Sequence, residues 1–270
     1  MNLPNNSDFF GWVFYLLNKY GMIFLRGAGV TLLLALVGTL IGCVIGLLVG
    51  VLRTLPYNKK ANPAIKILYR IVQFILAAYI EVFRGTPMIV QAMVLYYGSK
   101  QMFGVDMSAM FAGFFIVSIN TGAYMAETVR GGIDSIDVGQ TEAAKAIGMT
   151  HWQTMVSVIM PQTLRNILPQ IGNNLIINIK DTSVLNIISV TELFFSGNSA
   201  AGAYFRYFEV FFIICVIYFI MTFTCSRLLR WMEHKIDGSS YYSLVKSDMM
   251  ADPCGHNPVK NHGGNKTWTK

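Results

Sequence analysis

Long apolar runs separated by short polar stretches make up most of the chain between about residue 22 and residue 229. A run of roughly 20 apolar residues is long enough to cross a bilayer as a helix. One further apolar stretch, 67–103, is interrupted near Pro87, which disrupts a helix. Uninterrupted spans are predicted at roughly 22–52, 108–128, 166–190 and 205–229.

The apolar pattern also decides the fold class. Short segments of alternating apolar and polar residues, typical of outer-membrane barrels, do not occur in the sequence. A helix satisfies its own backbone groups in lipid. We therefore predict an all-α membrane protein with about five transmembrane helices.

Basic residues near the ends of the apolar runs predict the orientation. Arg53, Lys59, Lys60, Lys66 and Arg70 follow the first span, so this connection is predicted to be cytoplasmic and the N-terminus extracellular. If 67–103 crossed the membrane twice, the polar stretch 127–161 would lie outside with its own basic residues. One net crossing places that stretch and the C-terminus inside, and we adopt it.

These boundaries divide the chain into three parts. Residues 1–20 are polar and then aromatic, which predicts an extracellular interfacial segment. Residues 21–235 form the predicted transmembrane domain, which includes a loop at 130–161. Residues 236–270 are polar, which predicts a disordered cytoplasmic tail.

The first span carries a glycine at every fourth position over one stretch, which places small residues on one helix face and allows a neighbouring helix to approach closely. We call this set the glycine face. Its neighbour is either another helix of the same chain, which we favour, or a second subunit. The glycine face consists of Gly38, Gly42, Gly46 and Gly50.

Composition excludes several function classes. The chain is 54% hydrophobic and 13% charged, and its net charge of +7 comes from residues at the ends of apolar runs, which does not favour nucleic-acid binding. None of its four histidines lies in a predicted span, which excludes a Ser-His-Asp arrangement or a histidine-ligated metal at membrane depth. The phosphate-binding motif G-x-x-x-x-G-K-[ST] does not occur either. We predict no catalytic residue, no metal site and no bound cofactor, and any ATP used is hydrolysed by another chain.

Charged residues inside the apolar stretches are candidates for function, because they are costly in lipid. Glu81 and Arg84 are three residues apart and share a helix face, while Lys180 and Asp181 lie inside the polar fourth span. The two residues of each set form either a structural pair or part of a polar pathway. A zwitterionic solute would suit such a pathway, because its carboxylate matches Arg or Lys and its ammonium group matches Asp or Glu. The helix break at Pro87 adds free backbone groups of the kind that transporters use. The predicted pathway residues are Glu81, Arg84, Lys180, Asp181, Thr182 and Asn186.

The polar stretch 127–161 carries signals for two short helices. Asp137 with Gln140, and Thr150 with Gln153, fit helix starts, and Gly148 fits a helix end between them. The first helix is predicted at about 138–147. Its small side chains favour a docking surface for another protein, and the alternative is an amphipathic hairpin on the membrane. The predicted docking residues are Gly139, Glu142, Ala143, Ala144 and Gly148.

Several motifs together resemble one protein family. Glu142-Ala143-Ala144, Gly148 and Val158-Ile159-Met160-Pro161 resemble the EAA motif of ABC-importer permease subunits, with Val158 and Met160 as mild departures. The likeness covers about 22–232 and points to the polar amino acid branch, which includes histidine, glutamine, glutamate, arginine and opine permeases. It is further carried by Gly29-Val30-Thr31-Leu32, Glu81-Val82-Phe83-Arg84-Gly85-Thr86-Pro87, Asn120-Thr121-Gly122-Ala123-Tyr124, Arg130-Gly131-Gly132-Ile133 and Lys180-Asp181-Thr182-Ser183.

The resemblance implies a type I ABC importer permease fold and a set of partners. These are an ATP-binding cassette ATPase dimer that binds ATP and Mg, a second permease copy or paralogue, an extracellular solute-binding protein and an amino-acid substrate. It implies a multi-pass protein of the bacterial cell membrane, in which 130–161 is a coupling loop that docks on the ATPase. A channel or secondary transporter is the main alternative, and it would work without an ATPase. A membrane enzyme is disfavoured by the positions of the histidines.

Overall fold

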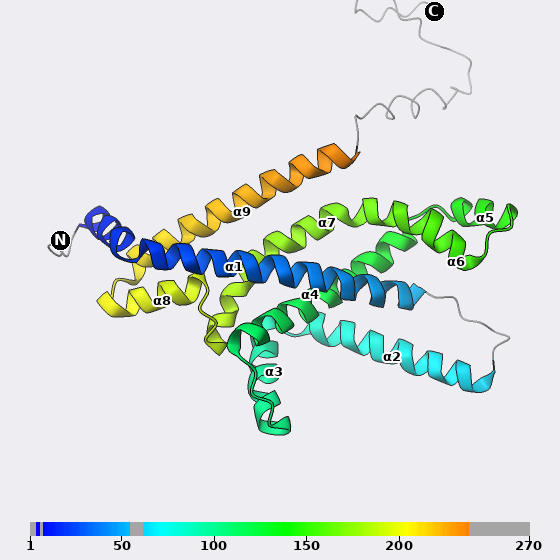
Figure 1. Cartoon of the computed structure of the whole chain (residues 1–270), viewed down its shortest axis with the longest axis horizontal. Coiled ribbons are helices and arrows are strands. Elements are labelled where there is room, and N and C mark those ends of the chain that lie inside the picture. Colours follow the sequence, from blue (N-terminus) through cyan, green and yellow to red (C-terminus); the bar gives the residue numbers. More distant parts are fainter. Residues whose placement is uncertain (1–3, 6–7, 55–61, 238–270) are drawn as a thin grey trace, which may run out of the picture. The chain divides into compact units, whose positions relative to one another are not determined.

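A computed structural model describes residues 4–5, 8–54 and 62–237 (Figure 1). The chain divides into two units, Met1–Trp231 and Met232–Lys270. The second unit is described only as far as Asp237, where the helix that begins at Tyr207 ends. The predicted disordered tail at 236–270 therefore lies almost entirely outside the described residues.

All regular elements of the described residues are helical, which confirms the predicted all-α class. Three helices, α1, α4 and α9 (over Tyr207–Lys235), are long and apolar enough to cross a membrane. The α-helices are α1 (Phe9–Thr54), α2 (Pro63–Gly85), α3 (Met88–Phe103), α4 (Ala109–Asp134), α5 (Val138–Ala146), α6 (His151–Thr154), α7 (Met160–Asp181), α8 (Leu193–Tyr204) and α9 (Tyr207–Asp237), with a π-helical segment η1 (Met155–Ile159) and a 3₁₀ segment η2 (Thr182–Ile188).

Helix α1 is longer than the predicted span, because it already begins at Phe9. The Asp8 carboxylate accepts a hydrogen bond from the Gly11 backbone N–H at 2.9 Å and so caps the first turn. Trp12 and Leu16 are buried on this part of the helix. The aromatic segment predicted to lie at the interface is therefore helical from Phe9 onward, and one face of it packs against the protein.

The glycine face packs against α4 of the same chain, which confirms the favoured interpretation. A Cβ atom added at Gly46 would lie 2.3 Å from Cβ of Met125, and one added at Gly42 would lie 2.6 Å from Cβ of Thr121. The register advances by four residues on both helices, so α1 and α4 are parallel and in close contact. The successive partners are Gly38 with Val117, Gly42 with Thr121, Gly46 with Met125 and Gly50 with Val129.

Because α1 and α4 run in the same direction, the chain between them must return once across the structure. Helix α2 makes this return antiparallel to α1, and the Gln73 side-chain amide donates to the Leu52 carbonyl at 2.9 Å near the start of the return. Farther along, the Tyr79 hydroxyl donates to the Ile119 carbonyl of α4 at 2.7 Å. Figure 1 shows α3 turning away from the axis of α2. The single net crossing predicted for 67–103 agrees with this arrangement.

The fourth predicted span, 166–190, is not one continuous α-helix. Helix α7 begins earlier, at Met160, and ends at Asp181, where η2 takes over until Ile188. Ser189 then adopts a left-handed conformation with φ of 63°, and this stops the helix. Helix α7 runs antiparallel to α4, because Ile167 lies against Gly132 and Asn178 against Thr121.

Candidate functional site

The coupling loop (130–161) begins as α4 ends, and its predicted helix signals are confirmed. The Asp137 carboxylate accepts from the Gly139 backbone N–H at 2.6 Å and caps α5. Thr150 and Gln153 form a reciprocal capping box at the start of α6. Gly148 lies between the two helices with φ of +82°, a conformation that a residue with a Cβ rarely adopts.

The predicted docking residues do not all face the same way. Ala144 is buried on the side of α5 that packs against η1, whereas Gly139, Glu142, Ala143 and Gly148 are exposed. Apolar side chains accompany them on the coupling loop, an arrangement that the sequence reasoning did not single out. Val138 is 70% exposed, Ile147 is 79% exposed and Trp152 is 66% exposed. The feature of the sequence that could have predicted this apolar surface is the presence of apolar residues inside a polar stretch.

At the start of the coupling loop, a group of charged residues joins the ends of α1 and α4. Arg130 donates through Nε to Glu127 Oε1 at 3.0 Å and through Nη1 to Asp134 at 2.7 Å. Glu127 also lies 3.7 Å from the Arg53 guanidinium, near the end of α1. In the sequence, Arg53 served as an indicator of orientation and Arg130 as part of a family motif, and no contact was predicted for either. The contacts show that they also brace α4 where it enters the loop.

The helix break before Pro87 offers fewer free backbone groups than predicted. The Gln91 side-chain amide donates to the carbonyls of Phe83 and Thr86, each at 2.9 Å. Asn120 of α4 in turn donates to the Gln91 side-chain oxygen at 2.9 Å. The expectation that the break presents open carbonyls is wrong for Phe83 and Thr86, because a buried glutamine occupies both.

Glu81 and Arg84, predicted to form either a structural pair or part of a polar pathway, make no ion pair with each other or with any other described residue. Both are exposed near the end of α2. The Arg84 guanidinium instead lies 5.7 Å from the centre of the Tyr124 ring on α4. Tyr124 belongs to the family motif that begins at Asn120, but no separate role was predicted for it.

Lys180 and Asp181 lie at the end of α7 and likewise form no ion pair among the described residues. Lys180 is exposed and Asp181 is half-buried. Thr182 is fully buried, and its hydroxyl donates to the Ile179 carbonyl at 3.0 Å, so it belongs to the helix end in this conformation. Asn186 is half-buried on η2.

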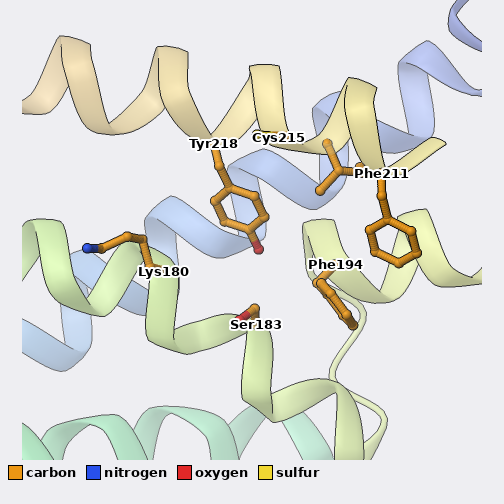
Figure 2. Close-up of a pocket in the computed structure, with 7 residues that line it drawn as sticks. Lys180, Ser183, Phe194, Phe211, Cys215 and Tyr218 are labelled. Atoms are coloured by element: carbon orange, nitrogen blue, oxygen red, sulfur yellow. The ribbon is translucent and has the colours of Figure 1, made fainter. Parts of the chain in front are cut away.

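Lys180 and Ser183 line a cavity of about 280 Å³ that is bounded by α7, η2, α8 and α9. Figure 2 shows the Ser183 hydroxyl and the rings of Phe194 and Tyr218 around the cavity, whereas the Lys180 side chain extends away from the Tyr218 ring. The remaining lining residues are Phe211, Ile214 and Cys215. Of the predicted pathway residues only Lys180 lines this cavity, so the cavity does not bring the set together.

Other polar residues of α7 hold helices together. The Asn178 side-chain amide donates to the hydroxyls of Thr39 at 2.8 Å and Thr121 at 2.9 Å, and so it joins α7 to α1 and α4. Asn174 is also buried, and it donates to the Gln170 carbonyl one turn earlier at 3.0 Å. Part of the unusual polarity of this helix is therefore structural.

Glu192 is a buried charged residue that the sequence reasoning missed. Its carboxylate accepts from the backbone N–H groups of Phe194 at 2.8 Å and Phe195 at 2.7 Å, and from the Tyr218 hydroxyl at 3.0 Å. The Thr31 hydroxyl of α1 completes the set at 3.3 Å. Glu192 thus fixes Phe194 and Tyr218, two walls of the cavity. The feature of the sequence that could have identified Glu192 is a single glutamate within an apolar run.

Comparison with known proteins identifies the family. The glutamine transport system permease protein GlnP of Escherichia coli K12 is 40% identical over 159 residues, which cover 58% of this chain and 73% of that protein. The arginine transport system permease protein ArtQ of Bacillus subtilis 168 is 33% identical over 158 residues, which cover 58% and 72% of the two chains.

Solved structures share the fold. A chain of an amino acid ABC transporter crystallised with histidines is 36% identical, with a TM-score of 0.72, and the match covers 85% of this chain and 99% of that one. A chain of the inward-facing MetNI methionine ABC transporter, at 22% identity and a TM-score of 0.61, shares the fold over 78% of this chain and 97% of its own. Residues 64–238 match the family described as binding-protein-dependent transport system inner membrane component. The chain belongs to this family of membrane permease subunits.

Proposed function

We propose that this chain is the permease subunit of an ABC importer and forms the membrane pathway for a polar amino acid. The observation that carries the proposal is its 40% identity to a glutamine permease, together with a fold shared over 85% of the chain with an amino acid ABC transporter. A channel or secondary transporter is disfavoured because a solved relative at 36% identity is a chain of an amino acid ABC transporter.

ATP hydrolysis belongs to a partner, an ATP-binding cassette ATPase dimer that binds ATP and Mg, because this sequence has no Walker motif. The coupling loop is the proposed contact. Its exposed apolar side chains, Val138, Ile147 and Trp152, are suited to a desolvated interface. The exposed Glu142 adds a charged group to the same surface. The charged group around Arg130 would transmit displacement of the loop to α4 and α1.

The remaining partners and the orientation complete the proposal. A second permease copy or paralogue and an extracellular solute-binding protein complete the importer in the bacterial cell membrane, with the N-terminus outside and the coupling loop and C-terminus inside. Glu81, Arg84, Lys180 and Asp181 are the proposed pathway residues, because they carry charge without an ion-pair partner among the described residues. Thr182 and Asn186 would support the end of α7 rather than contact solute.

Reconstitution tests the proposed function. The permease is combined with its ATPase and solute-binding protein in vesicles, and ATP hydrolysis and uptake are measured with L-glutamine and L-arginine. We expect at least one of the two to stimulate both activities. Uptake that continues without the ATPase would overturn the importer assignment.

Variants of the coupling loop test the docking surface. Glu142→Lys and Gly148→Asp are expected to leave the protein inserted while uncoupling uptake from ATP hydrolysis. Gln101→Lys, which adds a positive charge at an exposed position of α3, is the control and should transport normally. Normal uptake by both loop variants would contradict docking at this surface.

A further inference from the structure

Arg84 lies in the last turn of α2, next to the helix break, and it contacts an aromatic ring of α4. Its guanidinium carbon is 5.7 Å from the centre of the Tyr124 ring, within the range of a cation–π contact. Tyr124 belongs to α4, so the contact joins two helices. Both side chains are exposed on the surface of the chain.

The nearest acidic group on the same side of α4 is already engaged. Glu127 follows Tyr124 by three residues, so the two share a helix face. Its carboxylate binds Arg130 through two donors and lies 3.7 Å from Arg53. Arg84 therefore forms no ion pair and donates no hydrogen bond within the part of the chain that the structure describes.

A contact with an aromatic ring can position a guanidinium group without using its N–H hydrogen-bond donors. Arginine has five N–H donors in a planar fork that matches a carboxylate, and a ring beneath the plane leaves the edge of the fork available. A carboxylate partner would instead occupy that edge. Arg84 thus contacts a ring, and its N–H groups donate no hydrogen bond to another described residue.

We propose that Tyr124 is a positioning residue that holds Arg84 ready to bind the α-carboxylate of the transported amino acid. The inference rests on the proposed function, and it names the group of the substrate that this part of the pathway recognises. Arg84 makes the contact with substrate. Tyr124 acts through Arg84 by limiting the orientations of its side chain.

A second arginine in the same chain provides a matched control. The Arg227 guanidinium lies 5.0 Å from the centre of the Phe223 ring. These two residues are four apart on α9, so the contact lies within one helix, and neither residue belongs to the proposed pathway. Removal of the Phe223 ring therefore reports what the loss of an ordinary arginine–aromatic contact does to the complex.

The experiment measures binding of the amino acid to the permease–ATPase complex in lipid nanodiscs, without the solute-binding protein. The probes are L-glutamine, L-arginine and agmatine, which is arginine without its carboxylate. We expect Tyr124→Leu to weaken binding of whichever amino acids the wild-type complex binds by about three- to tenfold, the range of an exposed to partly desolvated cation–π contact. Agmatine binding should be unchanged. Tyr124→Phe should bind like the wild type, because it keeps the ring, and Phe223→Leu should also bind like the wild type.

A second comparison separates positioning from folding. In an Arg84→Lys background, Tyr124→Leu should cause little further loss, because lysine has no planar fork for the ring to hold. Wild-type affinity in Tyr124→Leu, or an equal loss for L-arginine and agmatine, would overturn the inference while leaving the proposed function intact. If neither amino acid stimulates ATP hydrolysis in the full reconstituted importer, the proposed function itself is wrong.

Discussion

Gly46→Ala tests whether the glycine face sets the distance between α1 and α4. A Cβ atom at this position would lie 2.3 Å from Cβ of Met125, 2.8 Å from its carbonyl carbon and 2.9 Å from the backbone nitrogen of Ala126. Two of these three atoms are backbone, so no change of rotamer relieves the overlap. Helix α4 itself has to move by about 1 Å to restore van der Waals contact at roughly 3.5 Å.

The expected cost follows from this geometry and from a matched site on the same helix. Overpacking a close contact costs about 1–3 kcal/mol. Alanine also favours helix over glycine by up to about 1 kcal/mol, which partly offsets the cost. Gly29 is an exposed glycine of α1 with nothing within 4 Å of an added Cβ, so Gly29→Ala has the same propensity gain without the overlap. The difference between the two variants isolates the overlap, at about 1–3 kcal/mol.

The assay is reversible unfolding of the purified protein in mixed micelles, followed by circular dichroism as the fraction of denaturing detergent increases. We expect Gly46→Ala to unfold at a lower detergent fraction than wild type, and Gly29→Ala to unfold at the same or a higher fraction. Equal stability of the two variants would refute the conclusion that close packing at Gly46 holds α1 against α4.

Four further predictions concern buried polar contacts, the coupling loop and the pathway. Asn178→Leu removes two interhelical hydrogen bonds and should lower the free energy of unfolding by about 1–2 kcal/mol. The control Asn173→Leu, at an exposed position of α7, should leave the free energy of unfolding unchanged. Equal effects of the two variants would contradict this prediction. Glu192→Gln replaces one carboxylate oxygen with an amide NH2 group, so one of the two backbone donors, Phe194 or Phe195, loses its acceptor. The variant should cost about 1–3 kcal/mol in the same unfolding assay, and unchanged stability would show that the second carboxylate oxygen is dispensable. Trp152→Ala should weaken ATPase binding, measured by co-purification, without loss of unfolding stability, and full retention of the ATPase would contradict docking at this residue. Asp181→Asn should reduce transport of L-arginine more than assembly with the ATPase, and an unchanged substrate preference would count against a pathway role.

The helical class, the break at Pro87 and the caps of the coupling loop could be predicted from the sequence because each depends on neighbouring residues. Apolar run length decides that the chain crosses lipid. Proline at 87 interrupts a helix through its own ring. Asp137, Thr150 and Gly148 act on backbone groups within three residues of themselves, and the structure confirms all three.

The partners of the charged and polar residues could not be predicted in this way, because they lie far apart in sequence. Spacing alone suggested that Glu81 pairs with Arg84, but Arg84 meets Tyr124, which is 40 positions farther along the chain. The break at Pro87 suggested open carbonyls, but a buried glutamine occupies those of Phe83 and Thr86.

The sequence by itself determined that this chain is a multi-helix membrane permease with a capped coupling loop, because hydrophobic length, proline and capping residues act locally. Only the tertiary structure decided that α4 covers the glycine face. It also decided that Asn178 joins three helices by hydrogen bonds and that Glu192 binds Tyr218 in the wall of a cavity. These outcomes depend on the register between α1, α4, α7 and α9. Register is set by packing of all their side chains at once, and no short stretch of sequence encodes it.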